Sequence, residues 1–223
     1  VGREVERRWV EISEPIREDS LPLVSTDWYG YTKVLGENLI DRYVRKENMP
    51  VTVIRFANVW GAGEILNWPQ FYLKTFLANF ESRMDNVGRA TYEALKAEDD
   101  GTHKLIIACD ENGRSWKKHN VEVRDLVHGF DLAFGNATTF GKTYQLAGPG
   151  PFTWDTAIPH LAEQLELPYC RVNLAGVSTT FYEYDMSGAR NDFGYNPQVD
   201  FEEAVREAIA YRDGESDAVI SRD

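Results

Sequence analysis

The fold is decided by residues 25–63, which read STDWYGYTKVLGENLIDRYVRKENMPVTVIRFANVWGAG. Three residue types that cap helices open this stretch, and apolar side chains then recur at helical spacing from about Trp28 to Glu47. A Met-Pro dipeptide ends the predicted helix, and the apolar, β-branched run at 51–56 is typical of a buried strand. A long helix that leads into a buried strand and a glycine-bearing loop predicts an α/β fold.

Tyr29 and Lys33 lie four residues apart near the start of this helix, so their side chains share one helix face. A free phenol titrates near ~10, and a neighbouring cation favours its phenolate form. Such a pair can exchange a proton with a substrate hydroxyl while another group takes the hydride. The spacing alone is not specific, because Tyr92 and Lys96 repeat it ahead of a polar turn. We interpret that second pair as a solvated helix face.

The loop at 57–63 is the expected place for a ligand, because open α/β sheets bind ligands beyond the carboxyl ends of their strands. Asn58 in this loop both donates and accepts hydrogen bonds, which makes it a candidate substrate ligand. Its alternative role is that of a turn-forming asparagine. Trp60, Trp68 and Trp116 are aromatic residues that could stack on a sugar, although core packing is the commoner use of such side chains.

The rest of the chain alternates predicted strands and helices, which fits an α/β layering. Residues 1–25 read as an extended, charge-rich loop, and residues 213–223 as a polar tail. The predicted helices span about 68–80, 124–136, 153–166 and 201–211, with residues 81–103 helical in part, and the predicted strands span about 105–108, 142–146 and 169–173.

The composition argues against several classes of partner. The net charge is −12 and the pI is near 4.8, which disfavours binding to nucleic acid or to an anionic membrane. Cys109 and Cys170 are too few and too far apart for a disulfide framework or a zinc site, and the histidines show no metal-ligand spacing. We therefore expect buried thiols, no metal and a cytoplasmic location. No apolar run in the sequence is long enough to predict a membrane span.

Five segments together carry a resemblance to a known family. They are residues 16–37 with the Tyr-x-x-x-Lys motif, the strand and loop at 55–63, the strand-to-helix segment at 121–127, and the segments at 142–148 and 187–197. Their sequences and their order are similar to those of the NAD-dependent epimerase/dehydratase family. These proteins are extended short-chain dehydrogenases/reductases that act mostly on nucleotide sugars. The resemblance implies NAD or NADP as cofactor, a sugar or nucleotide-sugar substrate, and a homodimer.

The resemblance also implies roles for single residues. Tyr29 would be the catalytic acid/base, and Lys33 would favour its phenolate and hold the nicotinamide ribose. Phe56 and Ala57 would line the nicotinamide side of the cofactor site. Asn58 would contact the substrate.

The family's substrate-phosphate ligand is typically an arginine about seven residues before the aspartate that Asp125 matches. Lys118 occupies that position here, and Arg114 is the alternative if the loop carries an insertion. Lysine lacks the two-pronged geometry of arginine, so a substrate with less phosphate, or none, is an open alternative. Arg55 and Arg124 are further basic residues available to a pyrophosphate.

No glycine-rich dinucleotide motif occurs in the sequence, although family members carry one between their first strand and helix. We therefore expect the C-terminal portion of an enzyme, with the catalytic Ser or Thr upstream of Val1. Two functions stay open at this point. The chain belongs to an NAD(P)-dependent epimerase, dehydratase or reductase, or it is a non-catalytic sugar-binding or dimerising remnant of that fold.

The expected domain organisation follows from the same comparison. A doubly wound, Rossmann-like parallel sheet is expected to be accompanied by a smaller C-terminal α/β substrate-binding domain. The remainder of the Rossmann-like domain is assigned to residues 1–66 and 121–147, the substrate-binding region to 67–120 and 148–212, and the tail to 213–223.

Overall fold

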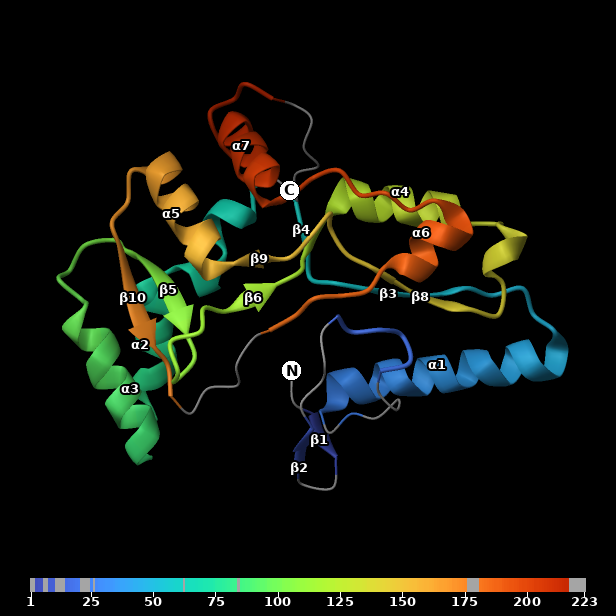
Figure 1. Cartoon of the computed structure of the whole chain (residues 1–223), viewed down its shortest axis with the longest axis horizontal. Helices are drawn as coiled ribbons and strands as arrows, with labels where there is room; N and C mark the ends of the chain where they lie inside the picture. Colours follow the sequence, from blue (N-terminus) through green and yellow to red (C-terminus); the bar gives the residue numbers. More distant parts are fainter. Residues whose placement is uncertain are drawn as a thin grey trace. The chain divides into compact units, whose positions relative to one another are not determined.

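The computed structural model describes residues 3–5, 8–10, 15–20, 25, 27–61, 63–83, 85–175 and 181–216, and Figure 1 shows the helices and strands in this part of the chain. Parallel strand pairs occur together with helices in these residues, which confirms the predicted α/β fold. The chain divides into two compact units. The first comprises residues 1–59, 119–151 and 182–199, and the second comprises residues 60–118, 152–181 and 200–223.

A parallel strand pair forms the centre of the first unit. Strand β3 (Val53–Phe56) pairs with β8 (Thr143–Leu146) in parallel register. Helix α1 (Trp28–Glu47) precedes β3 and has the predicted bounds. The residue after it, Asn48, has a left-handed backbone, which terminates the helix. The two-residue strand β4 (Val59–Trp60) follows β3 in the chain. Another two-residue strand, β7 (Val121–Glu122), directly precedes the next helix of this unit.

The side chains of β3 alternate between two helix layers, as the period of a strand requires. Ile54 packs against the core to which α4 (Val123–Ala133) contributes, and the Phe56 ring lies 6.1 Å from that of Phe130 on the same helix. Arg55 points to the opposite face and binds Glu37 of α1. The strand pair therefore lies between α1 on one face and α4 on the other, as Figure 1 shows.

The hydrophobic core of this unit fills the α4 side of the strand pair. Helix α6 (Ser187–Phe193) covers the same side, and its Phe193 ring lies 5.0 Å from the Tyr144 ring of β8. Gly129 allows α4 to approach β8 closely, because a Cβ at this position would lie 2.7 Å from the Leu146 side chain. The buried core residues are Ala57, Val121, Leu126, Ala133, Tyr144, Leu146, Ala147, Met186, Ala189, Phe193 and Tyr195.

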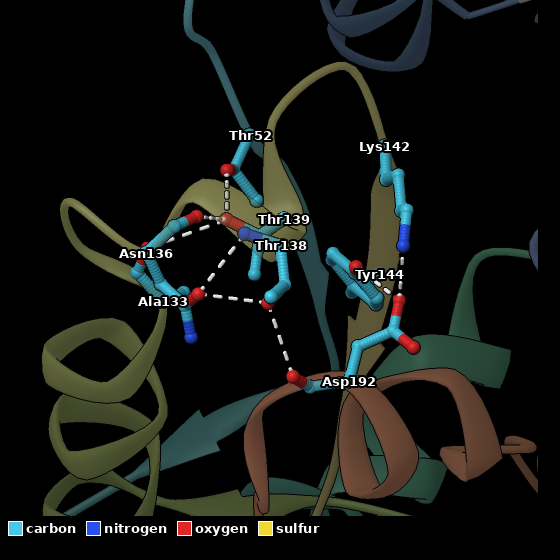
Figure 2. Close-up of polar contacts among 8 residues, drawn as sticks. All are labelled: Thr52, Ala133, Asn136, Thr138, Thr139, Lys142, Tyr144 and Asp192. Atoms are coloured by element: carbon cyan, nitrogen blue, oxygen red, sulfur yellow. Dashed lines mark hydrogen bonds and ion pairs between the residues drawn. The ribbon is translucent and has the colours of Figure 1, made fainter.

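A polar network fastens the amino ends of β3 and β8 to α6 (Figure 2). The Asp192 carboxylate accepts hydrogen bonds from Lys142 Nζ at 2.7 Å and from the Tyr144 hydroxyl at 2.6 Å. Beside it, the Thr139 hydroxyl in the short 3₁₀ helix η3 (Ala137–Thr139) lies 2.6 Å from the Thr52 hydroxyl. The structural network thus occupies the amino ends of the strands, whereas the candidates Phe56, Ala57 and Asn58 lie at the carboxyl end of β3.

The N-terminal region differs from the extended loop that the sequence predicts. Strands β1 (Arg3–Val5) and β2 (Arg8–Val10) form an antiparallel pair. Their charged side chains and the lack of a glycine or asparagine turn hide this hairpin from pattern analysis. Further on, the Ile16 N–H donates to the Glu183 carbonyl at 2.7 Å, which attaches the 15–20 segment to the same unit.

The second unit contains another parallel pair, β5 (Leu105–Cys109) with β10 (Tyr169–Asn173), and an antiparallel pair, β6 (Lys117–Lys118) with β9 (Phe152–Thr153). Its helices are α2 (Leu73–Glu81), α3 (Asn86–Ala97), α5 (Trp154–Leu165) and α7 (Phe201–Arg212). Among the described residues of this unit ten aromatic side chains are buried: Trp60, Phe71, Tyr72, Phe76, Phe80, Trp116, Phe152, Trp154, Phe181 and Phe201. Trp60 and Trp116 are therefore core residues and not surfaces for a sugar.

Several predicted bounds are corrected by the structure. The predicted helix at 68–80 is divided into η2 (Pro69–Phe71) and α2, because Tyr72 leaves the helical conformation to form a bridge with Leu105. A further short 3₁₀ helix, η1 (Ile65–Asn67), precedes it. Helix α4 ends three residues earlier than predicted, where Phe134 is extended and Gly135 has a φ of 70°. Helix α6 lies in a stretch with no predicted helix.

Cys109 and Cys170 are both buried and unpaired, which confirms the expectation of buried thiols. Burial raises the pKa of the Cys170 thiol to about 11. Within the described residues, no group of three or more His, Cys, Asp or Glu is arranged to hold a metal ion. In the same part of the chain, no helix has both the length and the apolar character that a membrane span needs.

Candidate functional site

The first turn of α1 presents the Tyr-x-x-x-Lys motif, and its geometry is fixed by a cap. The Asp27 carboxylate accepts a hydrogen bond from the Gly30 N–H at 2.7 Å, so Asp27 is the capping residue. The Ser25 hydroxyl in turn donates to Asp27 at 2.8 Å. A Cβ at position 30 would lie 2.2 Å from that hydroxyl, which explains the glycine inside the motif. Thr26 lies outside the described residues.

Tyr29 and Lys33 lie side by side on this turn. The Lys33 Nζ is 5.0 Å from the centre of the Tyr29 ring, and the Tyr29 side chain is 75% exposed. Within the described residues, the structure gives neither the Tyr29 hydroxyl nor the Lys33 ammonium a hydrogen-bond or ion-pair partner. Both groups are therefore available to a ligand. Lys96 lies over the Tyr92 ring of α3 in a similar way, at 5.8 Å, so the pair geometry does not by itself mark a catalytic site.

Phe56, Ala57 and Asn58 follow one another at the carboxyl end of β3. The Phe56 side chain is 52% exposed, whereas Ala57 is buried and its N–H donates to the Leu146 carbonyl at 2.9 Å. Asn58 is exposed, and its carbonyl accepts a hydrogen bond from the Val121 N–H at 3.0 Å. Its side-chain amide has no hydrogen-bond partner among the described residues. The backbone thus holds the turn, and the amide is free for a ligand.

An ion pair connects α1 to β3, and sequence reasoning missed it. Both guanidinium prongs of Arg55 bind the Glu37 carboxylate, with Nε to Oε1 at 2.8 Å and the second contact at 2.7 Å. Arg55 also donates to the Glu18 carbonyl at 2.9 Å. Arg55 is therefore engaged inside the fold, contrary to the expectation that it is available to a pyrophosphate. No local sequence pattern indicates this pair, because its two residues are 18 positions apart.

Lys118 is buried in the second unit, on strand β6. Its side chain is only 5% exposed, and its Nζ lies 5.6 Å from the centre of the Trp68 ring. Among the described residues no carboxylate forms an ion pair with it. Burial lowers the pKa of the Lys118 ammonium to about 8. The structure thus shows a desolvated cation with an aromatic neighbour, a feature that is more frequent at functional sites than elsewhere.

The other basic candidates have different surroundings. Arg114, also in the second unit, places its guanidinium 3.7 Å from the centre of the Phe181 ring. Arg124 binds the buried Glu122 carboxylate at 3.0 Å, so part of its guanidinium is engaged inside the fold. Lys118 and Arg114 therefore share one unit, and the Tyr29, Lys33 and 56–58 candidates share the other.

A family model supports this reading of the motifs. The model described as NAD dependent epimerase/dehydratase family matches residues 9–147, which is more than half of the chain. The chain belongs to the NAD-dependent epimerase/dehydratase family. All seven candidate site residues fall within the matched range. The comparison with curated proteins found no match.

Solved structures of the same fold class extend the comparison. A short-chain dehydrogenase/reductase superfamily protein from Agrobacterium tumefaciens with bound NAD is 29% identical, with a TM-score of 0.79, over 91% of this chain and 62% of its own. A dTDP-glucose 4,6-dehydratase from Bacillus anthracis in complex with NAD is 17% identical, with a TM-score of 0.62, over 96% and 59%. A UDP-glucuronic acid 4-epimerase from Bacillus cereus, in complex with UDP-glucuronic acid and NAD, is 18% identical, with a TM-score of 0.60, over 92% and 58%.

These likenesses show the Rossmann-like fold of short-chain dehydrogenases/reductases, which confirms the predicted fold class. The chain spans between 58 and 62% of the length of the three proteins. The residues present fit one end of a nicotinamide cofactor, because the Tyr29 phenol and the Lys33 ammonium have no hydrogen-bond or ion-pair partner among the described residues and the Phe56 ring is exposed. The sequence contains no G-x-G-x-x-G or G-x-x-G-x-x-G motif, so a pyrophosphate cradle of that type is not among these 223 residues.

Proposed function

We propose that the chain is part of an NAD(P)-dependent epimerase, dehydratase or reductase that acts on a sugar or nucleotide sugar. The observation that carries this proposal is the Tyr29–Lys33 pair in a chain of this family, because neither polar group has a hydrogen-bond or ion-pair partner in the part of the chain that the structure describes. NAD or NADP would supply the hydride acceptor or donor. The protein would supply the proton transfer that must accompany each hydride transfer at a sugar carbon.

Each candidate residue has a role that its surroundings permit. Tyr29 exchanges a proton with the reacting hydroxyl, and Lys33 favours the phenolate and binds the ribose hydroxyls of the cofactor. Phe56 offers its exposed ring to the nicotinamide, whereas the Ala57 side chain is buried in the core and would act only by holding the chain beside Phe56. Asn58 hydrogen-bonds the substrate through its free amide. The pyrophosphate cradle and the catalytic Ser or Thr are supplied by a segment that these residues do not include.

Lys118 is proposed to bind the anionic part of the substrate, with Arg114 as the alternative. A buried ammonium without a carboxylate partner is stabilised by any anion that reaches it, because desolvation strengthens the attraction. A lysine is a point charge, whereas a pyrophosphate is matched best by the fork of an arginine. A substrate with one anionic group is therefore a candidate beside the nucleotide sugars.

The second candidate function is a non-catalytic sugar-binding or dimerising module. The exposed apolar face of α1 favours the dimerising part of this alternative, and it is also compatible with a dimeric enzyme. The structure divides the predicted stripe: Val34 is buried and Ile40 and Val44 are half-buried, whereas Leu35 and Leu39 are about half exposed. We propose that the exposed half of the stripe packs against the same face of a second copy, as an isologous contact requires.

The test is cofactor-dependent turnover by the native full-length protein. The protein is incubated with NAD or NADP and with a panel that contains dTDP-glucose, UDP-glucuronic acid and free uronic acids, and products are identified by NMR spectroscopy. The proposal expects conversion of at least one member of the panel, and only with a nicotinamide cofactor present. If calorimetry shows sugar binding without any affinity for NAD or NADP, the non-catalytic module replaces the enzyme.

A further inference from the structure

The attachment of α1 to the strand pair rests on few contacts. Val34 is the single buried residue of this 20-residue helix, and its other apolar side chains are half-buried or exposed. Apolar packing within the described residues therefore fixes the rotation of the helix only weakly. A specific polar contact between α1 and β3 therefore contributes strongly to the orientation of the first turns of the helix.

The Glu37–Arg55 ion pair is that contact, and its geometry is restrictive. A two-pronged guanidinium–carboxylate pair fixes the plane of both groups as well as their distance. The Arg55 and Glu37 side chains are 30% and 17% exposed, so solvent competes with the pair less than at an open surface. Its contacts of 2.8 and 2.7 Å therefore define one rotation of α1 against β3.

The two ends of the pair lie beside the two halves of the candidate site. Glu37 is one helical turn after Lys33 and two turns after Tyr29. Arg55 is the residue before Phe56, on the strand whose carboxyl end carries the cofactor and substrate candidates. The ion pair thus directly connects the helix that carries Tyr29 and Lys33 to the strand whose carboxyl end carries Phe56, Ala57 and Asn58.

A third contact holds Arg55 from the other side. Its remaining nitrogen donates to the Glu18 carbonyl at 2.9 Å, and the Glu18 carboxylate accepts a hydrogen bond from the Gln145 N–H of β8 at 2.9 Å. The Gln145 side chain donates to the Ile16 carbonyl at 2.7 Å. The guanidinium is therefore held between α1 and a segment that is itself fixed to β8, which restricts its own movement.

We propose that Glu37 and Arg55 are positioning residues for the Tyr29–Lys33 pair: their ion pair sets the rotation of α1 so that both side chains meet a cofactor bound at the end of β3. The inference rests on the proposed function for its catalytic consequence, and on the geometry alone for its structural consequence. A small misplacement of reacting groups lowers turnover by about 10- to 100-fold without removing any catalytic group.

The test compares three variants of the native full-length protein. Glu37→Gln removes the charge and breaks the fork, and Arg55→Lys keeps a positive charge but loses the fork. Asp41→Asn is the matched control, because Arg45 binds Asp41 at 2.7 and 2.8 Å and both residues belong to α1. We expect Glu37→Gln and Arg55→Lys to lower kcat about 10- to 100-fold with KM changed less than threefold, and Asp41→Asn to leave both unchanged.

Crystal structures of the same variants give a readout that does not need activity. The inference expects α1 to be rotated or displaced against β3 and β8 in Glu37→Gln or in Arg55→Lys, and unmoved in Asp41→Asn. It is overturned if α1 keeps its orientation and kcat is unchanged in both fork-breaking variants. If α1 moves but Tyr29→Phe retains full turnover, the positioning of the helix stands and the proposed function fails. If Glu37→Gln does not fold, Arg55→Lys decides between these outcomes.

Discussion

Replacing Lys118 by methionine is expected to stabilise the protein. Methionine keeps an unbranched chain of similar length and removes the charge. Burial lowers the pKa of the ammonium from 10.5 to about 8, and the charged form therefore costs about 3 kcal/mol at neutral pH. The Trp68 ring 5.6 Å away offsets part of that cost. We expect the free energy of unfolding at pH 7 to rise by about 1–3 kcal/mol in Lys118→Met.

The pH dependence gives this prediction a second readout. The folded-state pKa of Lys118 lies below the unfolded value, so the unfolded chain binds more protons between about pH 8 and pH 10.5. The wild-type protein should therefore gain stability relative to Lys118→Met as the pH rises through this range. Below pH 8 the difference between the two proteins should be constant and at its largest.

Urea unfolding followed by tryptophan fluorescence at pH 7 and pH 9.5 measures both effects. Lys142→Met is the matched control, because Lys142 is half exposed and binds Asp192 at 2.7 Å, so its removal should give no gain in stability. A Lys118→Met protein that is less stable than wild type at pH 7, or whose difference from wild type does not depend on pH, would refute the reasoning. A gain in stability, joined to a raised KM for an anionic substrate, would show a cation that is kept for binding at the expense of stability.

Three further predictions follow from the geometry. Asp125→Ala leaves two backbone N–H groups without the carboxylate that accepts them at 2.8–2.9 Å, so the free energy of unfolding should fall by about 1–3 kcal/mol in urea titrations. The Lys142 ammonium and the Tyr144 hydroxyl hold the pKa of Asp192 in the folded protein below its usual value. The Asp192 carboxylate therefore stabilises the folded state fully above its pKa in the unfolded chain, and this stabilisation is lost as the pH falls through its pKa in the folded protein. In Asp192→Asn the free energy of unfolding should therefore fall less steeply than in wild type as the pH is lowered. The same steepness in both proteins would exclude this role. Leu39→Glu should convert a dimer to monomer in sedimentation experiments, and a wild-type monomer at high concentration would remove the dimer proposal.

The sequence was most informative where local signals agree with one another. The bounds of α1 are correct because a capping residue, a continuous apolar stripe and a following Met-Pro all mark the same helix. Strand β10 is predicted over its full length for a similar reason, since apolar and polar residues alternate along it. The predicted helix at 68–80 is wrong at its start, because the bridge from Tyr72 to Leu105 is a contact between distant segments.

The candidate site shows the same division between local and long-range information. The spacing of Tyr29 and Lys33 lies within one helical turn, so a sequence motif can display it. The Glu37–Arg55 pair joins residues 18 positions apart, and no local pattern distinguishes Arg55 from an unpaired cation. The burial of Lys118 likewise depends on packing in the second unit, and no local pattern reports it.

The most direct test of the central claim is the turnover of Tyr29→Phe in the native full-length protein, measured beside Tyr92→Phe. The second variant is a matched control, since Lys96 lies over the Tyr92 ring at 5.8 Å as Lys33 lies over the Tyr29 ring at 5.0 Å. Loss of one proton-transfer group should lower kcat by about 10²- to 10⁴-fold in Tyr29→Phe, with the Kd for the cofactor little changed, and Tyr92→Phe should keep wild-type turnover. Wild-type turnover in Tyr29→Phe would contradict the account and leave the motif as an ordinary surface pair.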